Sequence, residues 1–270
     1  MRFSEKVTEV LNFIETSILK HYSVEDVQLF YGDYRRRAEL LSDILRLIPE
    51  GVKVLDAGSA PGFTSLALSL LGYDVYSLDI NPEPYRTILE KYGIQVIKAD
   101  LENGIIPLKD WYIDCVVFTE VLEHLHPYKI LFTLSELNRV LKVGGILYLT
   151  TPNAVSIGKR IKMLFGMQPI GEKHIREYTM KEVVTLLTKH GFKILHNSFS
   201  TAYNLTPHDA RNEDYKSNLL RATLSYPTRG NLFHIITLPL IFTIPSLRAT
   251  IKIVARKEFH VKPQISNRRF

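Results

Sequence analysis

The feature that most constrains the fold of this chain is a glycine-containing turn within residues 52–68. An apolar, β-branched run at Val52–Leu55 leads to Asp56, and Gly58 and Gly62 follow. Leucines at helical spacing come next, at Leu66, Leu68, Leu70 and Leu71. This pattern predicts a strand, a turn and a helix. Glycine tolerates positive φ and close backbone approach, and a helix N-terminus presents unpaired N–H groups, so we expect the turn to hold a small molecule.

The charge beside the turn narrows the kind of ligand. Turns that bind a dinucleotide read Gly-x-Gly-x-x-Gly and place a pyrophosphate on the helix N-terminus. Here Ala60 and Phe63 occupy positions where that pattern has glycine. The Asp56 carboxylate would repel a pyrophosphate and attract a cation. The sequence therefore favours a ligand with an ammonium and a sulfonium group, and it disfavours a nicotinamide-dependent oxidoreductase.

The stretch Asp56-Ala-Gly-Ser-Ala-Pro-Gly62 resembles the first motif, Asp-x-Gly-x-Gly-x-Gly, of the class I S-adenosylmethionine-dependent methyltransferases, with Ala60 in place of the middle glycine. Glu120–His124 and Leu141–Gly145 resemble two further stretches of these proteins, so the resemblance covers residues 52–195 and points to methyltransferase domains of type 11 or type 23. It implies an α/β fold with a Rossmann-like, doubly wound sheet of seven strands, mostly parallel with the last strand antiparallel. It also implies S-adenosyl-L-methionine as the cofactor.

Acidic residues follow the next two predicted strands. Asp79 lies about twenty residues past the glycines, where a carboxylate would bind a ribose diol, although a helix N-cap gives the same pattern. In the resembling family, an aspartate in the place of Asp100 accepts the adenine amino group, but a turn aspartate would look the same. An arginine ahead of the turn holds the methionine carboxylate in that family, and Arg37 is the nearest match, with a solvated basic face as the alternative. The expected cofactor-binding residues are Arg37, Asp56, Gly58, Ser59, Ala60, Gly62, Asp79, Ile80, Asp100, Leu101, Thr119 and Glu120.

Few catalytic residues are expected, because methyl transfer from a sulfonium needs alignment and a base only where the acceptor loses a proton. Glu120 would lie one helical turn from Glu123 and His124, and His174 would join them from a later loop. We expect Glu123, His124 and His174 to be catalytic, with an imidazole as the base for a hydroxyl acceptor and no metal. The same side chains resemble the divalent-metal site of small-RNA 3′-terminal 2′-O-methyltransferases, which leaves a metal-dependent RNA enzyme as an alternative.

Composition restricts the class of protein less sharply. The 270 residues are 46% hydrophobic and 23% charged, which is typical of a globular protein that buries a sizeable core. Cys115 is the single cysteine, and residues 1–21 lack an apolar core of signal-peptide type, so we expect a cytoplasmic protein without a transmembrane segment. The net charge of +6 permits an RNA partner but does not require one.

The order of the segments predicts five regions. They are a helical N-terminal cover at 1–49, the cofactor-binding core at 50–199, an insertion at 200–248 that shapes the acceptor site, a last core strand at 249–257 and a basic tail at 258–270. Within the insertion, residues 232–247 are apolar but too short and too interrupted by proline to span a bilayer, so only weak association with a membrane surface is expected.

The sequence thus predicts a methyltransferase that acts on a hydroxyl group of a small-molecule, glycan or lipid-type acceptor. Besides the RNA enzyme, a non-catalytic cofactor-binding module remains an alternative. The aspartates Asp56, Asp79 and Asp100 indicate that the cofactor is bound but do not indicate that a reaction follows.

Overall fold

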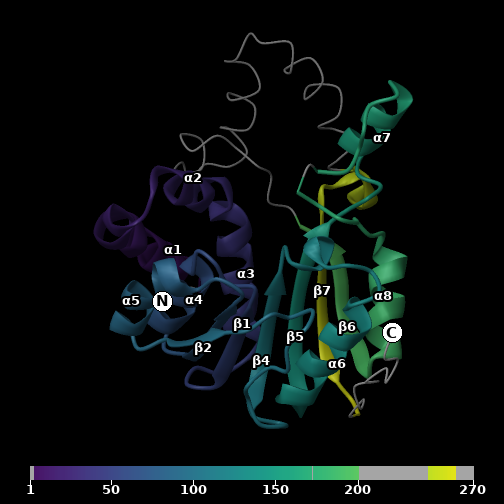
Figure 1. Ribbon diagram of the computed structural model, residues 1–270. Coiled ribbons are helices and arrows are strands. Elements are labelled where there is room, and N and C mark those ends of the chain that lie inside the picture. The colour runs from purple at the N-terminus through teal and green to yellow at the C-terminus, as the bar shows by residue number, and fades with distance from the viewer. Residues whose placement is uncertain (1–2, 172, 201–242, 260–270) are drawn as a thin grey trace.

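The computed structural model describes residues 3–171, 173–200 and 243–259 (Figure 1). Its centre is a seven-stranded sheet in the order β3-β2-β1-β4-β5-β7-β6. Strands β1 to β5 pair in parallel, whereas β7 is antiparallel to both of its neighbours. The strands are β1 (Lys53–Ala57), β2 (Asp74–Asp79), β3 (Gln95–Lys98), β4 (Ile113–Thr119), β5 (Leu141–Pro152), β6 (Phe192–Phe199) and β7 (Thr250–Lys257). The predicted fold class is confirmed.

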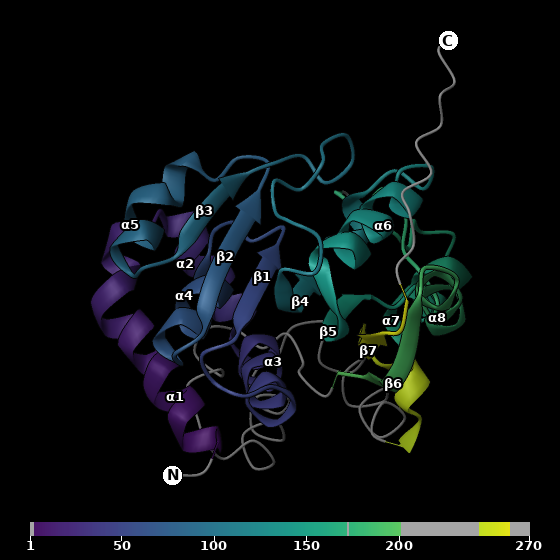
Figure 2. The same cartoon turned by 90° about the horizontal axis from the view of Figure 1, so that it is seen from below.

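Helices cover both faces of the sheet (Figure 2). One core lies between the sheet and α1 to α5, and the other lies under α6 and α8. Successive strand residues point to opposite faces, so Val54 enters the first core and Leu55 the second. The α-helices are α1 (Phe3–Phe13), α2 (Val24–Gly32), α3 (Tyr34–Leu47), α4 (Phe63–Leu70), α5 (Arg86–Lys91), α6 (Ile130–Val140), α7 (Ile157–Leu164) and α8 (Met180–Lys189).

Several elements differ from the expectation. Strands β5 and β6 extend beyond their apolar residues at 146–150 and 192–195, because Leu141 pairs with Ile113 of β4 and the ladders with β7 continue to Pro152 and Phe199. Helix α2 carries too weak an apolar period to be predicted. Helix α7 is amphipathic but was not among the expected elements. The expected helix through Glu120 is wrong: Glu120 has a φ of 55°, and only a 3₁₀ turn, η4 (Leu122–His124), follows it.

The boundaries expected for the domains stay predictions. Helices α1 to α3 fall within residues 1–49 and pack on the sheet, as a cover would. Most of the expected insertion and of the basic tail lies outside the described residues, as does most of the apolar stretch 232–247. Among the described helices, none combines the length and the apolar character that a membrane span requires.

A cluster of charges ties the N-terminal helices to the last strand. Lys252 on β7 donates to Glu39 at 2.6 Å and to Asp43 at 2.8 Å, and both acids lie on α3. Tyr148 on β5 also donates to Asp43, at 3.1 Å. The side chain of Lys252 is only 11% exposed, so its ammonium depends on these two carboxylates for solvation.

Lys252→Met should therefore destabilise the fold by on the order of 2–3 kcal/mol, because two half-buried carboxylates would lose their counter-ion. Urea unfolding measures the loss. The matched control is Lys193→Met. Lys193 lies 3.7 Å from Glu258 in an exposed ion pair, so its loss should lower the free energy of unfolding by under about 0.5 kcal/mol. Equal effects of the two substitutions would contradict the role given to Lys252.

Candidate active site

The turn after β1 has the conformation that only glycine adopts readily. Gly58 has a φ of 80° and Gly62 a φ of 95°, and α4 begins directly after Gly62. A Cβ on Gly58 would lie 2.4 Å from a methyl carbon of Val121, so a larger residue has no room. The amides of Gly58 and Ser59 donate to the carbonyl of Leu78 at 2.8 and 3.0 Å, which fixes the turn against the end of β2.

Asp56 lies beneath this turn. Its carboxylate is 2% exposed and accepts a hydrogen bond from the Ser65 hydroxyl on α4 at 2.6 Å. Burial raises the pKa of Asp56 to about 6; the Ser65 hydrogen bond lowers it, Asp79 raises it and Arg37 lowers it further. The negative charge is therefore poorly stabilised by the protein alone, and a cation above the turn would stabilise it.

Asp79 lies beside the turn, at the carboxyl end of β2. One of its oxygens accepts the amide of Ala60 at 3.0 Å, and the other accepts the amide of Asn81 at 3.0 Å. Ile80, the next residue, is 62% exposed and forms an apolar edge next to the carboxylate. This arrangement places a fixed carboxylate at the rim of the turn.

Asp100 lies in a turn after β3, one strand further out. Its oxygens accept the Glu102 amide at 2.8 Å and the Asn103 side chain at 2.9 Å, and the second of these bonds lowers the pKa of Asp100 most. The neighbouring Leu101 is buried. Both carboxylate oxygens thus accept hydrogen bonds from within the turn. This is the arrangement expected of a turn aspartate, the alternative role given for Asp100 above.

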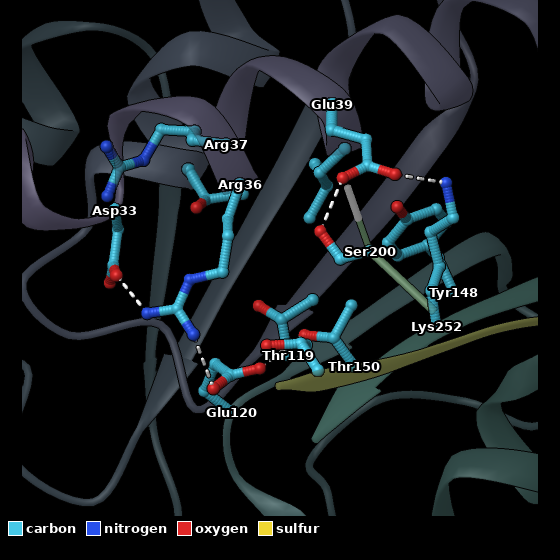
Figure 3. Close-up of a pocket in the computed structure, with 13 residues that line it drawn as sticks. Asp33, Arg36, Arg37, Glu39, Thr119, Glu120, Tyr148, Thr150, Ser200 and Lys252 are labelled. Carbon is cyan, nitrogen blue, oxygen red and sulfur yellow. Dashed lines mark hydrogen bonds and ion pairs between the residues drawn. The ribbon is translucent and has the colours of Figure 1, made fainter. Parts of the chain in front are cut away.

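The arginines of α3 do not form a solvated face. Arg37 is 8% exposed, donates to the carbonyl of Phe30 at 3.2 Å and lies over the rings of Phe30 and Phe63. Arg36 instead reaches into a pocket at the carboxyl ends of β4 and β5, where it pairs with Glu120 at 2.9 Å and with Asp33 (Figure 3). Both arginines line this pocket, and within the described residues the buried Nε of Arg37 has no hydrogen-bond partner.

Glu120 joins this pocket to the catalytic candidates. Its backbone is in the left-handed region, which is uncommon for glutamate, and it is held there by Thr150. The Thr150 carbonyl accepts the Glu120 amide at 2.9 Å, and the Thr150 hydroxyl donates to the Glu120 carboxylate at 2.9 Å. Thr119 precedes it at the end of β4 and lines the same pocket.

The catalytic candidates come together without Glu120. Ligand atoms of Glu123, His124 and His174 all lie within 4.8 Å of one another. His174 Nδ1 lies 2.8 Å from a Glu177 oxygen, and His124 Nδ1 lies 3.0 Å from the Lys173 carbonyl, while neither Nε2 has a hydrogen-bond partner within the described residues. Burial lowers the pKa of His174, and the charges of His124 and Lys159 lower it further, so the ring is neutral at pH 7 and can accept a proton.

Glu123 and the neighbouring lysine complete this cluster. Glu123 is 1% exposed and accepts the Thr151 hydroxyl at 3.0 Å, and burial raises its pKa to about 8. The Ile175 amide donates to the Glu123 carbonyl at 2.8 Å, which docks the loop that carries His174. Lys159 on α7 pairs with Glu177 on the side away from His174, since each uses a different carboxylate oxygen.

The comparison with known families decides the identity of this arrangement. The model of a family described as "Methyltransferase domain" matches residues 31–197. The chain belongs to this family. S-Adenosylmethionine is therefore the cofactor of this domain.

Individual relatives of the methyltransferase domain are distant. A protein of Mycolicibacterium smegmatis named "Probable S-adenosylmethionine-dependent methyltransferase" is 28% identical over 162 residues, which are 59% of this chain and 59% of that protein. The ubiquinone biosynthesis O-methyltransferase of Xanthomonas axonopodis pv. citri is 31% identical over 136 residues, 48% of this chain and 53% of that protein. The matched region thus spans little more than half the length of these relatives.

A solved structure shows the same fold. An S-adenosylmethionine-dependent methyltransferase from Archaeoglobus fulgidus superimposes on the methyltransferase domain with a TM-score of 0.56 and 19% identity. The superposition covers 85% of this chain and 99% of that one.

Two side chains that lie at the site were not among the expected residues. Arg36 lines the pocket together with the expected Arg37, and its position four residues before the buried Leu40 places it at the edge of the buried face of α3. Lys159 carries no signal in the sequence, because its ion pair with Glu177 depends on the path of the chain after β5.

The stability of the wild-type protein should fall as pH rises, and Asp56→Asn should abolish this dependence on pH. The folded protein retains a proton on Asp56 that the unfolded chain has released, because the pKa is about 6 when folded and about 3.8 when unfolded. As pH rises through this window, the wild type should lose about 3 kcal/mol of stability relative to the variant, and the difference should then stay constant. Urea unfolding of the cofactor-free protein across the window measures it.

The control is Asp74→Asn at the exposed start of β2, for which the difference from the wild type should stay near zero. A pH-independent difference between the wild type and Asp56→Asn would contradict the assignment of a raised pKa to this carboxyl.

Proposed function

We propose that this chain transfers the methyl group of S-adenosylmethionine to a hydroxyl group of a small-molecule, glycan or lipid-type acceptor. The observation that carries the proposal is the Glu177–His174 pair: a carboxylate orients Nδ1, and the opposite nitrogen of a neutral imidazole is left to accept the hydroxyl proton. S-Adenosylmethionine supplies an activated methyl group when bound. The protein has to align the acceptor with it and exclude water.

The residues at the turn fit such a cofactor. Asp79 presents a carboxylate where a ribose diol would bind, and Arg36 or Arg37 would hold a methionine carboxylate. Asp56 supplies buried negative charge near an ammonium or sulfonium group. The remaining expected contacts, from Ser59, Ala60, Ile80, Asp100, Leu101 and Thr119, stay predictions.

Two findings support a hydroxyl acceptor. The Glu177–His174 pair has the geometry of a general base, which a hydroxyl acceptor needs and a thiolate or amine acceptor needs less. The relative from Xanthomonas is named for O-methylation in ubiquinone biosynthesis, which makes an acceptor with a ring hydroxyl the first to assay.

The test is methyl transfer from S-adenosylmethionine with a labelled methyl group, first to hydroxylated aromatic compounds and then to fractionated cell extract. The proposal expects label in an alkali-stable ether. Label in a base-labile ester or in protein would overturn the hydroxyl assignment. Tight cofactor binding with no labelled product in any fraction would favour a non-catalytic cofactor-binding module.

A metal-dependent RNA 2′-O-methyltransferase is the second candidate, and the Glu123, His124 and His174 cluster favours it. Both imidazoles are oriented through Nδ1 by an oxygen, as in metal sites, and a carboxylate lies beside them. Glu120, the expected fourth member, is paired with Arg36 instead. Metal analysis of the purified protein and of His174→Ala separates the two: a wild type that is active after treatment with a chelator removes the metal-dependent reading.

A further inference from the structure

We propose that the tip of α7 docks on an anionic membrane surface. The tip consists of four apolar residues in and just after the last turn of the helix, namely Met163, Leu164, Phe165 and Met167. Their exposed fractions are 61%, 82%, 77% and 57%. Figure 1 shows α7 at the top of the molecule, standing away from the sheet.

The tip is not part of either core. No residue of α7 is buried, and residues 162–168 are all exposed. Apolar side chains that lie singly on a surface need no explanation, but four within five residues form a contiguous patch of the kind that marks an interaction site. The patch projects from the body, so it is shaped to insert into a soft surface and not to line a groove.

The charges around the tip select the surface. Arg160 and Lys162 are exposed on α7, and Lys173 is exposed where the loop returns. Within the described part of the chain, neither Arg160 nor Lys162 forms an ion pair, whereas Lys159 is occupied by Glu177. A short amphipathic segment with apolar residues at its end and free basic residues above them matches the acyl chains and the headgroups of an anionic bilayer.

The tip is connected to the catalytic cluster. Lys159 pairs with Glu177, which orients His174, and Arg160 donates to the Val155 carbonyl at the start of the segment. The helix that carries the tip thus contacts the residue that orients His174. Membrane docking would also narrow the acceptor: its hydroxyl would belong to a molecule dissolved in or anchored to the membrane. Only this statement about the acceptor rests on the proposed function.

Co-sedimentation of the full chain with vesicles tests the docking. We expect binding to phosphatidylcholine vesicles that contain phosphatidylglycerol and little binding to phosphatidylcholine alone. Phe165→Ser should weaken the partition coefficient at least tenfold, because one large apolar side chain no longer enters the bilayer. Lys162→Ala should weaken it about fivefold and make it less dependent on salt.

The matched control is Leu131→Ser, which removes an apolar side chain that is 50% exposed on α6 and should leave vesicle binding unchanged. Equal effects of Phe165→Ser and Leu131→Ser, or equal binding to neutral and anionic vesicles, would overturn the proposal. A wild-type dimer that Phe165→Ser dissociates, without vesicle binding, would assign the tip to a second copy. Protection of the tip from hydrogen exchange without vesicles would assign it to residues 201–242 of the same chain; either result also overturns the proposal.

Vesicle binding and methyl transfer are separate measurements. A protein that binds vesicles but transfers no methyl group would support the docking proposal and contradict the proposed function. A protein that transfers methyl groups but does not bind vesicles would support the proposed function and contradict the docking proposal.

Discussion

Asp79→Ala is expected to weaken the binding of S-adenosylmethionine at least a hundredfold. A carboxylate that accepts two hydroxyl hydrogen bonds from a ribose would contribute about 1.5–3 kcal/mol for each bond, and alanine can accept neither. The substitution also removes the hydrogen bond that the Ala60 amide donates to Asp79, so the glycine turn is held less firmly. Isothermal titration calorimetry measures the dissociation constant directly and needs no acceptor.

The matched control is Asp74→Ala, at the opposite end of β2, where the carboxylate pairs weakly with Lys53 at 3.9 Å. Its affinity for the cofactor should equal that of the wild type. Thermal unfolding of both variants distinguishes a lost contact from a lost fold. A folded Asp79→Ala protein with unchanged affinity would exclude the ribose role of this residue.

His174→Ala is expected to lower kcat by a factor of about 10²–10⁴ while the affinity for S-adenosylmethionine stays the same. The reason is the loss of the only proposed base, whose Nδ1 is held by Glu177 and whose ring lies in the cluster with Glu123 and His124. The measurement is methyl transfer to the acceptor found in the labelling assay, with cofactor affinity determined in parallel.

The control for a general loss of imidazole is His126→Ala, whose exposed ring pairs with Glu102 and should not affect kcat. The pH profile gives a second readout. The pKa of His174 is below the ordinary value near 6.5, so the wild-type rate should fall only below that pH, as the ring becomes protonated and can no longer accept a proton. A rate that falls equally with pH in His174→Ala would show that another group titrates.

The sequence predicted the parts of the site that depend on strand ends. Glycine spacing and the acid after each apolar run placed Asp56, Asp79 and Asp100 at the carboxyl ends of β1 to β3, because parallel strands end on the same edge of a sheet. The structure then separates them: Asp56 lies under the turn, Asp79 beside it and Asp100 in its own loop. Which ligand atoms each one binds stays a prediction.

The parts that sequence could not give depend on rotation and on rare backbone conformations. A turn of about 100° along α3 gives the two arginines different partners, since Arg36 pairs with Glu120 and Arg37 lies over Phe30 and Phe63, and three consecutive arginines hide that phase. Glu120 belongs to a stretch that is predicted as helical, yet its φ of 55° turns the chain the other way. The pairing of Lys159 with Glu177 joins residues whose approach only the folded chain determines.

The close approach of Gly58 and Val121 couples the glycine turn to the loop after β4. A bulkier residue at position 121 would press on the turn, and Val121→Ala would not make room for an alanine at position 58, because the φ of 80° at Gly58 strains any residue with a side chain. Attempts to redirect this chain to new acceptors through the loop after β4 should therefore keep Gly58 and leave position 121 no larger than valine.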